Sequence, residues 1–337
     1  MKRHIGVIGA GGWGTAIALL LAKKGHAVTL WARREEICQA LRTQRENIAY
    51  LPGVLLPASI DITNSLEEAT KTKEIVVLAS PSKAVRSTVS AFKEYVTPGT
   101  IIVSLSKGLE RNTFLRPSQV IAEVVGNEGQ VVVISGPNHA EEVARGIPTA
   151  TVAAGYSLEA AQEVQEVFMT PKFRVYTNTD IIGVELAGAL KNVIALAAGV
   201  CDGLGYGDNT KATLMTRGLA EIARLGVKMG AETITFAGLA GIGDLIATCT
   251  SKHSRNWQAG FALGQGESLA DIRKGMVVEG VNTTETAAML AAREGVSMPI
   301  TTALHEVIFA GKPPHQAVTE LMLRDKAHEI EDILPRE

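Results

Sequence analysis

The chain has 337 residues, 46% of them hydrophobic, and its 33 Lys and Arg against 35 Asp and Glu leave a formal charge of -2 at pH 7. This length and composition predict two domains with large buried cores, and the charge balance excludes nucleic acid or an anionic membrane surface as the main partner. Three cysteines without CxxC spacing and seven histidines without an HxxxH or HExxH pair predict a reducing, cytoplasmic setting and no metal site.

The chain opens on a short apolar run at residues 5–9, a glycine-rich turn, a helical stretch at residues 15–24 and a second strand at residues 27–31. In the turn, Gly9, Gly11 and Gly14 have GxGxxG spacing. An ordinary tight turn has the same spacing. Between a strand and a helix, however, these glycines allow a sharp turn, a close approach to pyrophosphate and close helix packing. We expect a dinucleotide at the helix N-terminus.

The end of the second strand bears on the choice of dinucleotide. An NAD enzyme usually has Asp or Glu there to bind the ribose 2′-hydroxyl, whereas this chain has Arg33 and Arg34. Two guanidinium groups can bind a 2′-phosphate, which favours NADP(H). Because Glu35 and Glu36 follow directly, NAD(H) stays possible. The alternative for each arginine is the solvated start of a helix.

Further along, short β-branched runs alternate with helical stretches as far as about residue 177. This alternation predicts a doubly wound parallel sheet of the Rossmann type, with helices on both faces and ligands at the carboxyl ends of the strands. The chemistry is then expected in the loops at residues 79–81, 106–108 and 136–138. The strands are expected at residues 5–9, 27–32, 74–80, 100–106, 130–136, 149–154 and 173–177.

From residue 180 onward the strand signal disappears, and Ala, Leu, Gly and Met recur at helical spacing. We therefore expect a dinucleotide-binding domain at residues 1–179 and an all-α substrate-binding domain at residues 180–337. Residues 181–200 are nearly all apolar and about long enough to span a membrane, but they contain Glu185 and Lys191. Such a helix is typical of a protein interior.

Lys191 is the candidate for moving a proton. Transfer of a hydride to or from a carbon bearing a hydroxyl group needs such a residue, and a lysine serves only if burial or a second cation makes it easy to deprotonate. Asn192 beside it offers an amide for orienting a substrate. The alternative is a helix lysine whose stem is buried while its charge reaches solvent.

Two further charged residues fit with Lys191. Lys107 follows a strand at the carboxyl edge of the sheet, where a second cation would favour deprotonation of Lys191 and polarise a carbonyl oxygen. The alternative for Lys107 is a surface loop lysine. Asp244 stands in a glycine-rich apolar run, where a carboxylate can be buried only if it is paired, and a lysine is the obvious partner.

Ser254, Arg255 and Asn256 precede another helical stretch. A hydroxyl, a guanidinium and an amide beside free helix N–H groups form a cradle suited to phosphate. The alternative is a plain serine N-cap with a solvated arginine. Cys249 nearby is interpreted as a small apolar filler.

Six motifs together resemble one family. With these motifs the chain resembles bacterial NAD(P)-dependent sn-glycerol-3-phosphate dehydrogenase over nearly its full length. The motifs are GAGGWGTA at residues 9–16, YLPG at 50–53, SKGLE at 106–110, ELAGALKNV at 185–193, GLAGIGDLIATCTS with HSRN at 238–256, and VVEGVNT at 277–283.

The resemblance implies interconversion of sn-glycerol 3-phosphate and dihydroxyacetone phosphate, supply of glycerol phosphate for phospholipid synthesis, and a homodimer without membrane insertion. It implies that Lys191 accepts the proton, aided by Lys107, Asp244 and Asn192, and that the phosphate docks between the domains on Arg255 and Asn256. The implied substrate contacts are Lys107, Gly136, Asn138, Lys191, Asp244, Thr248, Ser254, Arg255 and Asn256. The implied cofactor contacts are Gly9, Gly11, Gly12, Trp13, Gly14, Arg33, Arg34, Lys107, Ala140, Arg255, Val277 and Glu279.

The chain departs from the family pattern in two places. Gly12 stands where the family commonly has Ser, which removes a hydroxyl from the phosphate cradle but keeps the backbone donors. After Gly136 and Pro137, Asn138, His139 and Ala140 replace the usual Ser-Phe-Ala.

Two other functions are compatible with parts of the pattern. One is a related two-domain dehydrogenase of hydroxy acids or hydroxyacyl thioesters, which lacks support from a His–Glu pair before the helical domain. The other is a redox sensor that binds nicotinamide without turnover, which has no need of a buried lysine and an anion cradle.

Overall fold

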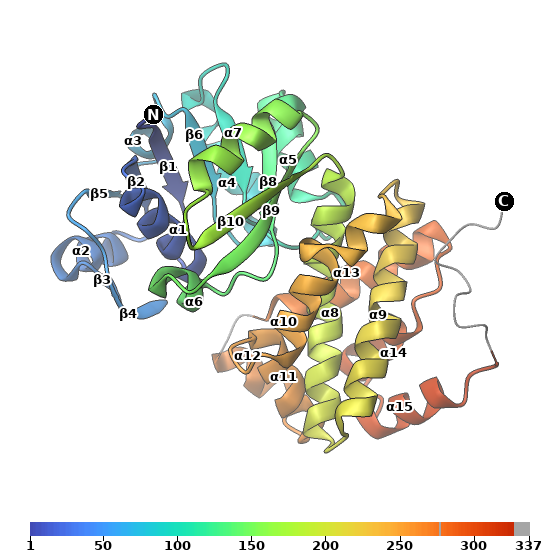
Figure 1. Cartoon of the computed structure of the whole chain (residues 1–337). Helices are drawn as coiled ribbons and strands as arrows, with labels where there is room; N and C mark the ends of the chain where they lie inside the picture. The colour runs from blue at the N-terminus through green and yellow to red at the C-terminus, as the bar shows by residue number, and fades with distance from the viewer. Residues whose placement is uncertain (276–277, 327–337) are drawn as a thin grey trace. The chain divides into compact units, whose positions relative to one another are not determined.

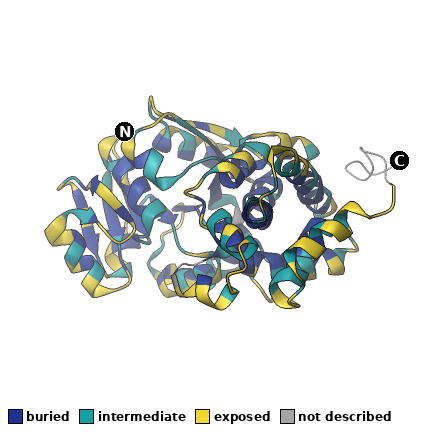
Figure 2. Cartoon of the chain, turned by 90° about the horizontal axis from the view of Figure 1, so that it is seen from below, coloured by how far each residue is buried: buried dark blue, intermediate teal, exposed yellow. Residues whose placement is uncertain are grey.

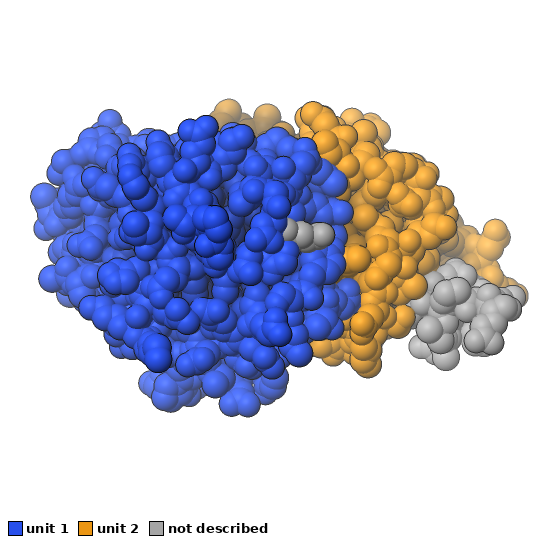
Figure 3. Space-filling view, turned by 90° about the horizontal axis from the view of Figure 1, so that it is seen from above, with its two compact units in different colours: residues 1–107, 115–181 blue, residues 108–114, 182–337 orange. Residues whose placement is uncertain are grey.

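The computed structural model describes residues 1–275 and 278–326 (Figure 1). By its internal contacts the chain divides into two compact units, which Figure 3 colours separately. Unit 1 consists of residues 1–107 and 115–181, and unit 2 of residues 108–114 and 182–337. The short segment 108–114 thus leaves unit 1 directly after Lys107 and packs with the helical part of the chain.

Unit 1 is built on an eight-stranded sheet in the order β10–β9–β8–β7–β6–β1–β2–β5. All seven runs predicted as strands lie in this sheet, so the predicted Rossmann-type architecture is confirmed. In chain order the strands are β1 (His4–Ile8), β2 (Ala27–Trp31), β5 (Ile60–Thr63), β6 (Ile75–Leu78), β7 (Ile101–Ser104), β8 (Val131–Ser135), β9 (Thr149–Gly155) and β10 (Phe173–Asn178).

Helices cover both faces of the sheet, as expected for strands that are apolar throughout. Successive residues of β1 belong to two different cores, since Val7 packs in one apolar cluster and Ile8 in the other. Figure 2 shows the buried strands in dark blue between helices with exposed outer faces. The helices of unit 1 are α1 (Gly12–Lys23), α2 (Glu35–Gln44), α3 (Leu66–Thr70), α4 (Val85–Phe92), α5 (Pro117–Val125), α6 (Ala140–Arg145) and α7 (Leu158–Phe168).

The sheet differs from a purely parallel one at a single pairing. β9 runs antiparallel to β8, whereas every other neighbouring pair is parallel. The six-residue helix α6 joins these two strands and rises only about 9 Å. A helix this short cannot return the chain to the starting edge of the sheet, so β9 begins beside the end of β8 and runs back.

Three short strands were not predicted from the sequence. β5 adds an edge to the sheet, while β3 (Glu46–Asn47) and β4 (Leu51–Leu55) form a separate two-stranded hairpin. The hairpin lacks a strand signal because β3 has two residues and Pro52 and Gly53 interrupt β4.

Unit 2 is helical within the described residues. Its long first helix is the apolar segment singled out above, and 94% of its most apolar 18-residue window is buried, which confirms an interior helix. The helices are α8 (Ile181–Gly203), α9 (Asp208–Lys228), α10 (Asp244–Thr250), α11 (Arg255–Gly264), α12 (Leu269–Gly275), α13 (Glu279–Glu294), α14 (Pro299–Phe309) and α15 (Pro314–Met322).

Glycines allow α8 and α11 to approach backbone to backbone. A Cβ added at Gly199 would lie 2.1 Å from the carbonyl oxygen of Trp257, and one added at Gly260 would lie 1.9 Å from that of Leu196. No side chain fits at either position without separating the helices. This contact fixes the start of α11 against α8, and most of the chemistry-bearing residues of unit 2 lie on these two helices and on α10.

Candidate active site

The glycine-rich turn joins β1 to α1 in the geometry that the sequence predicts. Gly9 has a φ of +123°, which side chains rarely adopt, and a Cβ at Gly14 would lie 1.9 Å from the carbonyl oxygen of Gly9. Helix α1 begins at Gly12, and no side chain caps its first backbone N–H groups. The turn is therefore a backbone cradle with the positive end of a helix dipole, as phosphate binding requires.

The hairpin β3–β4 supports this turn, and sequence reasoning missed it. The buried side chain of Asn47 donates through Nδ2 to the carbonyl oxygen of Ala10 at 2.9 Å and to Oγ1 of Thr15 at 2.7 Å. A Cβ at Gly12 would lie 2.7 Å from the carbonyl oxygen of Tyr50. Glycine at position 12 thus lets the hairpin lie directly on the turn.

Arg33 and Arg34 lie at the end of β2, as expected. The strand ends at Trp31, the following Ala32 is buried, and both arginines are exposed. Arg34 contacts the hydroxyl of Tyr50 through Nη2 at 3.4 Å. Glu35 already belongs to the first turn of α2. The two guanidinium groups are therefore the first charged groups after the strand.

Lys107 lies half-buried just past the end of β7. Its ammonium group donates to the carbonyl oxygen of Gly136 at 3.2 Å and to Oδ1 of Asn138 at 3.4 Å. Lys107 is thus held by the loop that follows β8, unlike a lysine on a surface loop. Ala140, another predicted cofactor contact, begins α6 and packs toward Gly12.

The buried Lys191 of α8 is paired with Asp244, as the sequence predicts. Their side chains are only 8% and 3% exposed, and Nζ of Lys191 donates to Oδ1 of Asp244. Thr248, one turn further along α10, accepts a second hydrogen bond from Nζ at 2.7 Å. The burial of the ammonium group excludes a lysine that reaches out to solvent.

Asn192 and Asn256 form a second buried group beside this pair. Nδ2 of Asn256 donates to Oδ1 of Asn192 at 2.9 Å, and Oδ1 of Asn256 accepts from the backbone N–H of Gly280 at 2.9 Å. Asn256 therefore links α8, α11 and α13. Its carbonyl oxygen and one amide hydrogen are occupied by this link, which leaves the second amide hydrogen for an anion.

Ser254 and Arg255 begin α11. Ser254 is the N-cap, since its Oγ accepts from the backbone N–H of Trp257 at 3.2 Å. Arg255 is exposed, and within the described part of the chain no hydrogen bond or ion pair holds its guanidinium group. The sequence left two interpretations of this helix start, a serine N-cap and a phosphate cradle. The structure shows the cap, and the exposed Arg255 beside it is still compatible with a cradle. Glu279 begins α13. Val277 lies outside the described residues.

The cysteines of unit 2 are unreactive by environment. Burial raises the pKa of the Cys249 thiol to about 12 and that of Cys201 to about 11. Because the thiolate is the nucleophile, neither is suited to covalent catalysis near neutral pH. Cys249 is a buried filler of the apolar core, as expected.

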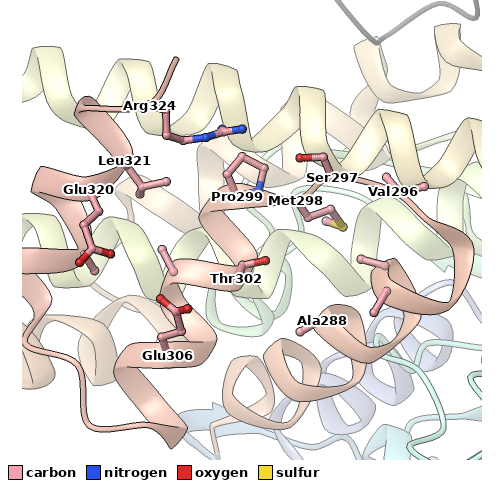
Figure 4. A pocket seen from close by; sticks show the side chains of 14 residues that line it. Ala288, Val296, Ser297, Met298, Pro299, Thr302, Glu306, Glu320, Leu321 and Arg324 are labelled. Atoms are coloured by element: carbon pink, nitrogen blue, oxygen red, sulfur yellow. The ribbon is translucent and has the colours of Figure 1, made fainter. Parts of the chain in front are cut away.

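A cavity of about 360 Å³ opens elsewhere in unit 2, among α13, α14 and α15 (Figure 4). Its lining combines alanines with Glu306, Glu320 and Arg324. None of the residues predicted for catalysis or binding lines it. The candidate residues of unit 1 and those of unit 2 thus lie apart from this cavity.

The fold and these groups define a class of protein: a nicotinamide-dependent dehydrogenase with a Rossmann-type dinucleotide unit and a helical unit that carries a buried lysine. Two family models match the chain, the N-terminal part of NAD-dependent glycerol-3-phosphate dehydrogenase over residues 4–161 and its C-terminal part over residues 180–319.

Similar proteins give the same result. Glycerol-3-phosphate dehydrogenase [NAD(P)+] of Moorella thermoacetica is 56% identical over 98% of this chain and 99% of its own length. The Geobacillus kaustophilus protein of the same name is 54% identical over 98% and 97%. The crystal structure of glycerol-3-phosphate dehydrogenase from Coxiella burnetii has a TM-score of 0.92 at 37% identity, covering 96% of this chain and 99% of that one. The chain belongs to the NAD(P)-dependent glycerol-3-phosphate dehydrogenase family of oxidoreductases.

Proposed function

We propose that the chain interconverts sn-glycerol 3-phosphate and dihydroxyacetone phosphate by hydride transfer at C2 of the substrate. The observation that carries this proposal is the buried ion pair of Lys191 with Asp244, which places a proton-carrying group inside a predominantly apolar helix. Membership of the family supports the substrate. In the reducing direction the product would supply glycerol phosphate for phospholipid synthesis.

The residues of unit 1 fit a dinucleotide. The uncapped start of α1 and the side-chain-free turn at Gly9, Gly11, Gly12 and Gly14 provide backbone donors for a pyrophosphate. Trp13 and Ala140 border this turn, and Lys107 and Glu279 are further proposed contacts. When bound, the reduced cofactor supplies the hydride for the carbonyl carbon.

Lys191 is the proposed proton carrier. In the reducing direction its ammonium group gives a proton to the oxygen on C2, and in the oxidising direction the neutral amine takes the hydroxyl proton back. Asp244 and Thr248 accept hydrogen bonds from Nζ and so fix its direction. We propose that Asn192 and Lys107 orient and polarise the substrate oxygen.

The substrate phosphate is proposed to bind at the start of α11. Arg255 supplies an exposed guanidinium group, Ser254 caps the helix, and Asn256 retains one amide hydrogen. Helix start and guanidinium together favour a dianion. Gly136, Asn138 and Thr248 complete the proposed set of substrate contacts.

NADP(H) is the proposed preferred cofactor, with NAD(H) also accepted. The support is that Arg33 and Arg34 are the first charged groups after β2, and that Glu35 lies 3.7 Å from Arg42. A carboxylate next to Arg42 is less available to a ribose hydroxyl. Arg255 is proposed as a further cofactor contact.

We propose the same division of labour as in the sequence prediction, with residues 1–179 binding the dinucleotide and residues 180–337 binding the substrate. We also propose a cytoplasmic homodimer without membrane insertion. The buried state of α8 supports the last point.

The proposal is tested by following the absorbance of reduced nicotinamide when the purified chain is mixed with NADPH and dihydroxyacetone phosphate. We expect oxidation of NADPH, with a kcat/KM at least about 100-fold higher than for unphosphorylated dihydroxyacetone, because charge-assisted hydrogen bonds to the phosphate are lost in the latter. Binding of NADPH without its oxidation would favour a sensor, and equal rates with both ketones would overturn the proposed substrate.

A further inference from the structure

We propose that Thr151 is a positioning residue for Lys107, acting through the side chain of Asn138. Thr151 lies in β9, and its side chain is fully buried. Its hydroxyl donates to the carbonyl oxygen of Ser135 at 3.0 Å and accepts from Nδ2 of Asn138 at 3.0 Å. Oδ1 of Asn138 in turn accepts from the ammonium group of Lys107.

These hydrogen bonds form a series from the carbonyl of Ser135 to the ammonium of Lys107, and the groups at its two ends fix the direction of every bond in it. The carbonyl of Ser135 can only accept, so it takes the single hydroxyl proton of Thr151, and the ammonium of Lys107 can only donate. Thr151 must therefore accept from Asn138, which turns the amide NH₂ toward Thr151 and the amide oxygen toward Lys107. Without the threonine hydroxyl the amide NH₂ loses its acceptor on β9, so the side chain of Asn138 is no longer anchored to the sheet and holds Lys107 less firmly.

The local backbone keeps this arrangement tight. Gly136 has a φ of +152°, and a Cβ there would lie 3.0 Å from Cα and 3.1 Å from Oγ1 of Thr151. The carbonyl oxygen of Gly136 also accepts from Lys107. The loop after β8 can therefore lie directly on Thr151 and hold the lysine from two sides. Asn138, where the family usually has serine, is the residue that spans from Thr151 to Lys107.

The decisive variant is Thr151→Val, which has the same shape and lacks the hydroxyl. Its amine-reactive labelling at Lys107, measured by mass spectrometry on the protein without substrate, should be about 3-fold to 10-fold faster relative to the exposed Lys172, as loss of about one hydrogen bond predicts. The kcat/KM for dihydroxyacetone phosphate should fall about 10-fold. The activity arm rests on the proposed function, whereas the labelling arm does not, so failure of the two can be told apart.

Three controls separate positioning from stability. Thr151→Ser keeps the hydroxyl and should restore wild-type labelling and kcat/KM. Thr149→Val makes the same chemical change two residues earlier on the same strand, where the threonine hydroxyl bonds to the Ile147 carbonyl instead, and should leave both unchanged. In an Asn138→Ser background, Thr151→Val should have less than about a 2-fold further effect.

Unchanged labelling of Lys107 in Thr151→Val, or a full additional loss in the Asn138→Ser background, would overturn the proposal. If Thr151→Val does not fold, Asn138→Ser alone interrupts the same series of hydrogen bonds at a half-buried position. Faster labelling of Lys107 in that variant is then the expected result, and wild-type labelling the contrary one.

Discussion

Lys191 carries its charge on a helix face that is otherwise packed with apolar side chains. Nothing in the packing of α8 requires an ammonium group, and its burial is tolerated because Asp244 and Thr248 accept its hydrogen bonds. A hydrophobic residue at this position would be at least as stable with an apolar partner. We therefore propose that the pair serves the chemistry of the site.

Replacing the lysine tests this interpretation. Lys191→Ala should lower kcat at least about 100-fold, because it removes the proton carrier, while the Kd for NADPH stays within about 2-fold. Turnover is measured by NADPH oxidation and binding by nicotinamide fluorescence. The matched control is Lys211→Ala, which removes a lysine paired with Asp202 at 2.8 Å in the same unit and should change kcat less than about 3-fold. Near-normal turnover of Lys191→Ala would refute the proton-carrier role.

The arginines after β2 lead to a prediction about cofactor choice. Arg33→Ala and Arg34→Ala should each raise the KM for NADPH about 10-fold and leave the KM for NADH within about 2-fold, because only NADPH has a 2′-phosphate to lose contacts with. Initial rates measured at varied concentrations of NADPH and of NADH test this prediction. Arg174→Ala on β10 is the control, because Arg174 lies over the ring of Tyr176 on the edge strand farthest from β5 and should affect neither cofactor. An equal rise in the KM for NADH and for NADPH would show that the arginines do not bind the 2′-phosphate.

At the scale of elements, the sequence predicts those parts whose signal is local. Seven of the eight strands of the sheet are apolar runs rich in β-branched residues, and the glycine turn needs residues with no Cβ, so both can be predicted directly. The hairpin β3–β4 has no such signal, because its strands are short and its stability comes from contacts such as that of Asn47 with Ala10. Likewise, the reversed direction of β9 follows from the shortness of α6, which residue types alone do not reveal.

The candidate site also contains some contacts that the sequence predicts and others that it does not. A buried lysine and a buried aspartate in apolar runs each require a partner, and the pairing of Lys191 with Asp244 follows from that requirement. The link from Asn192 through Asn256 to Gly280 does not follow, because three helices far apart in the sequence must first be packed. Thr151 is a plain strand residue in the sequence, and only the folded sheet shows what it contacts.

The crossing of α8 and α11 gives a prediction at this scale. Gly260→Ala puts a Cβ 1.9 Å from the carbonyl oxygen of Leu196, so α11 must move away and take Ser254, Arg255 and Asn256 with it. We expect the KM for dihydroxyacetone phosphate to rise at least about 10-fold and the free energy of unfolding to fall about 1–3 kcal/mol, as overpacking typically costs.

Gly207→Ala is the control for this variant. It lies in unit 2 before α9, and a Cβ there has no neighbour within 4 Å. Its KM for the ketone should equal that of the wild type. An unchanged KM in Gly260→Ala as well would show that the start of α11 does not bind the substrate.

At the scale of the whole molecule, the protonation of a buried carboxyl group in unit 2, that of Glu221, is linked to folding. Glu221 of α9 accepts from the backbone N–H groups of Ile300 and Thr301 at the start of α14. Burial raises the pKa of Glu221 to about 7 from an ordinary value of 4.5, despite these hydrogen bonds and the nearby Arg224, which lower it. The folded chain thus binds a proton at this site more tightly than the unfolded chain does.

The sign of the pH dependence follows from this shift. Because the pKa is raised in the folded state, the stabilisation is fully present below about pH 4.5 and is lost as the pH rises through about 7, an effect of roughly 3 kcal/mol. Glu221→Gln stays neutral and should lose this dependence, so its melting temperature should rise relative to that of the wild type between pH 5 and pH 8. Glu294→Gln, which removes a carboxylate paired with Arg293, should follow the wild type across the same range. Calorimetric scans at pH 5, 6, 7 and 8 compare the three proteins directly, so that all other titrating groups cancel. A constant difference between Glu221→Gln and the wild type would mean that Glu221 is already charged in the folded chain and serves only as a cap for α14.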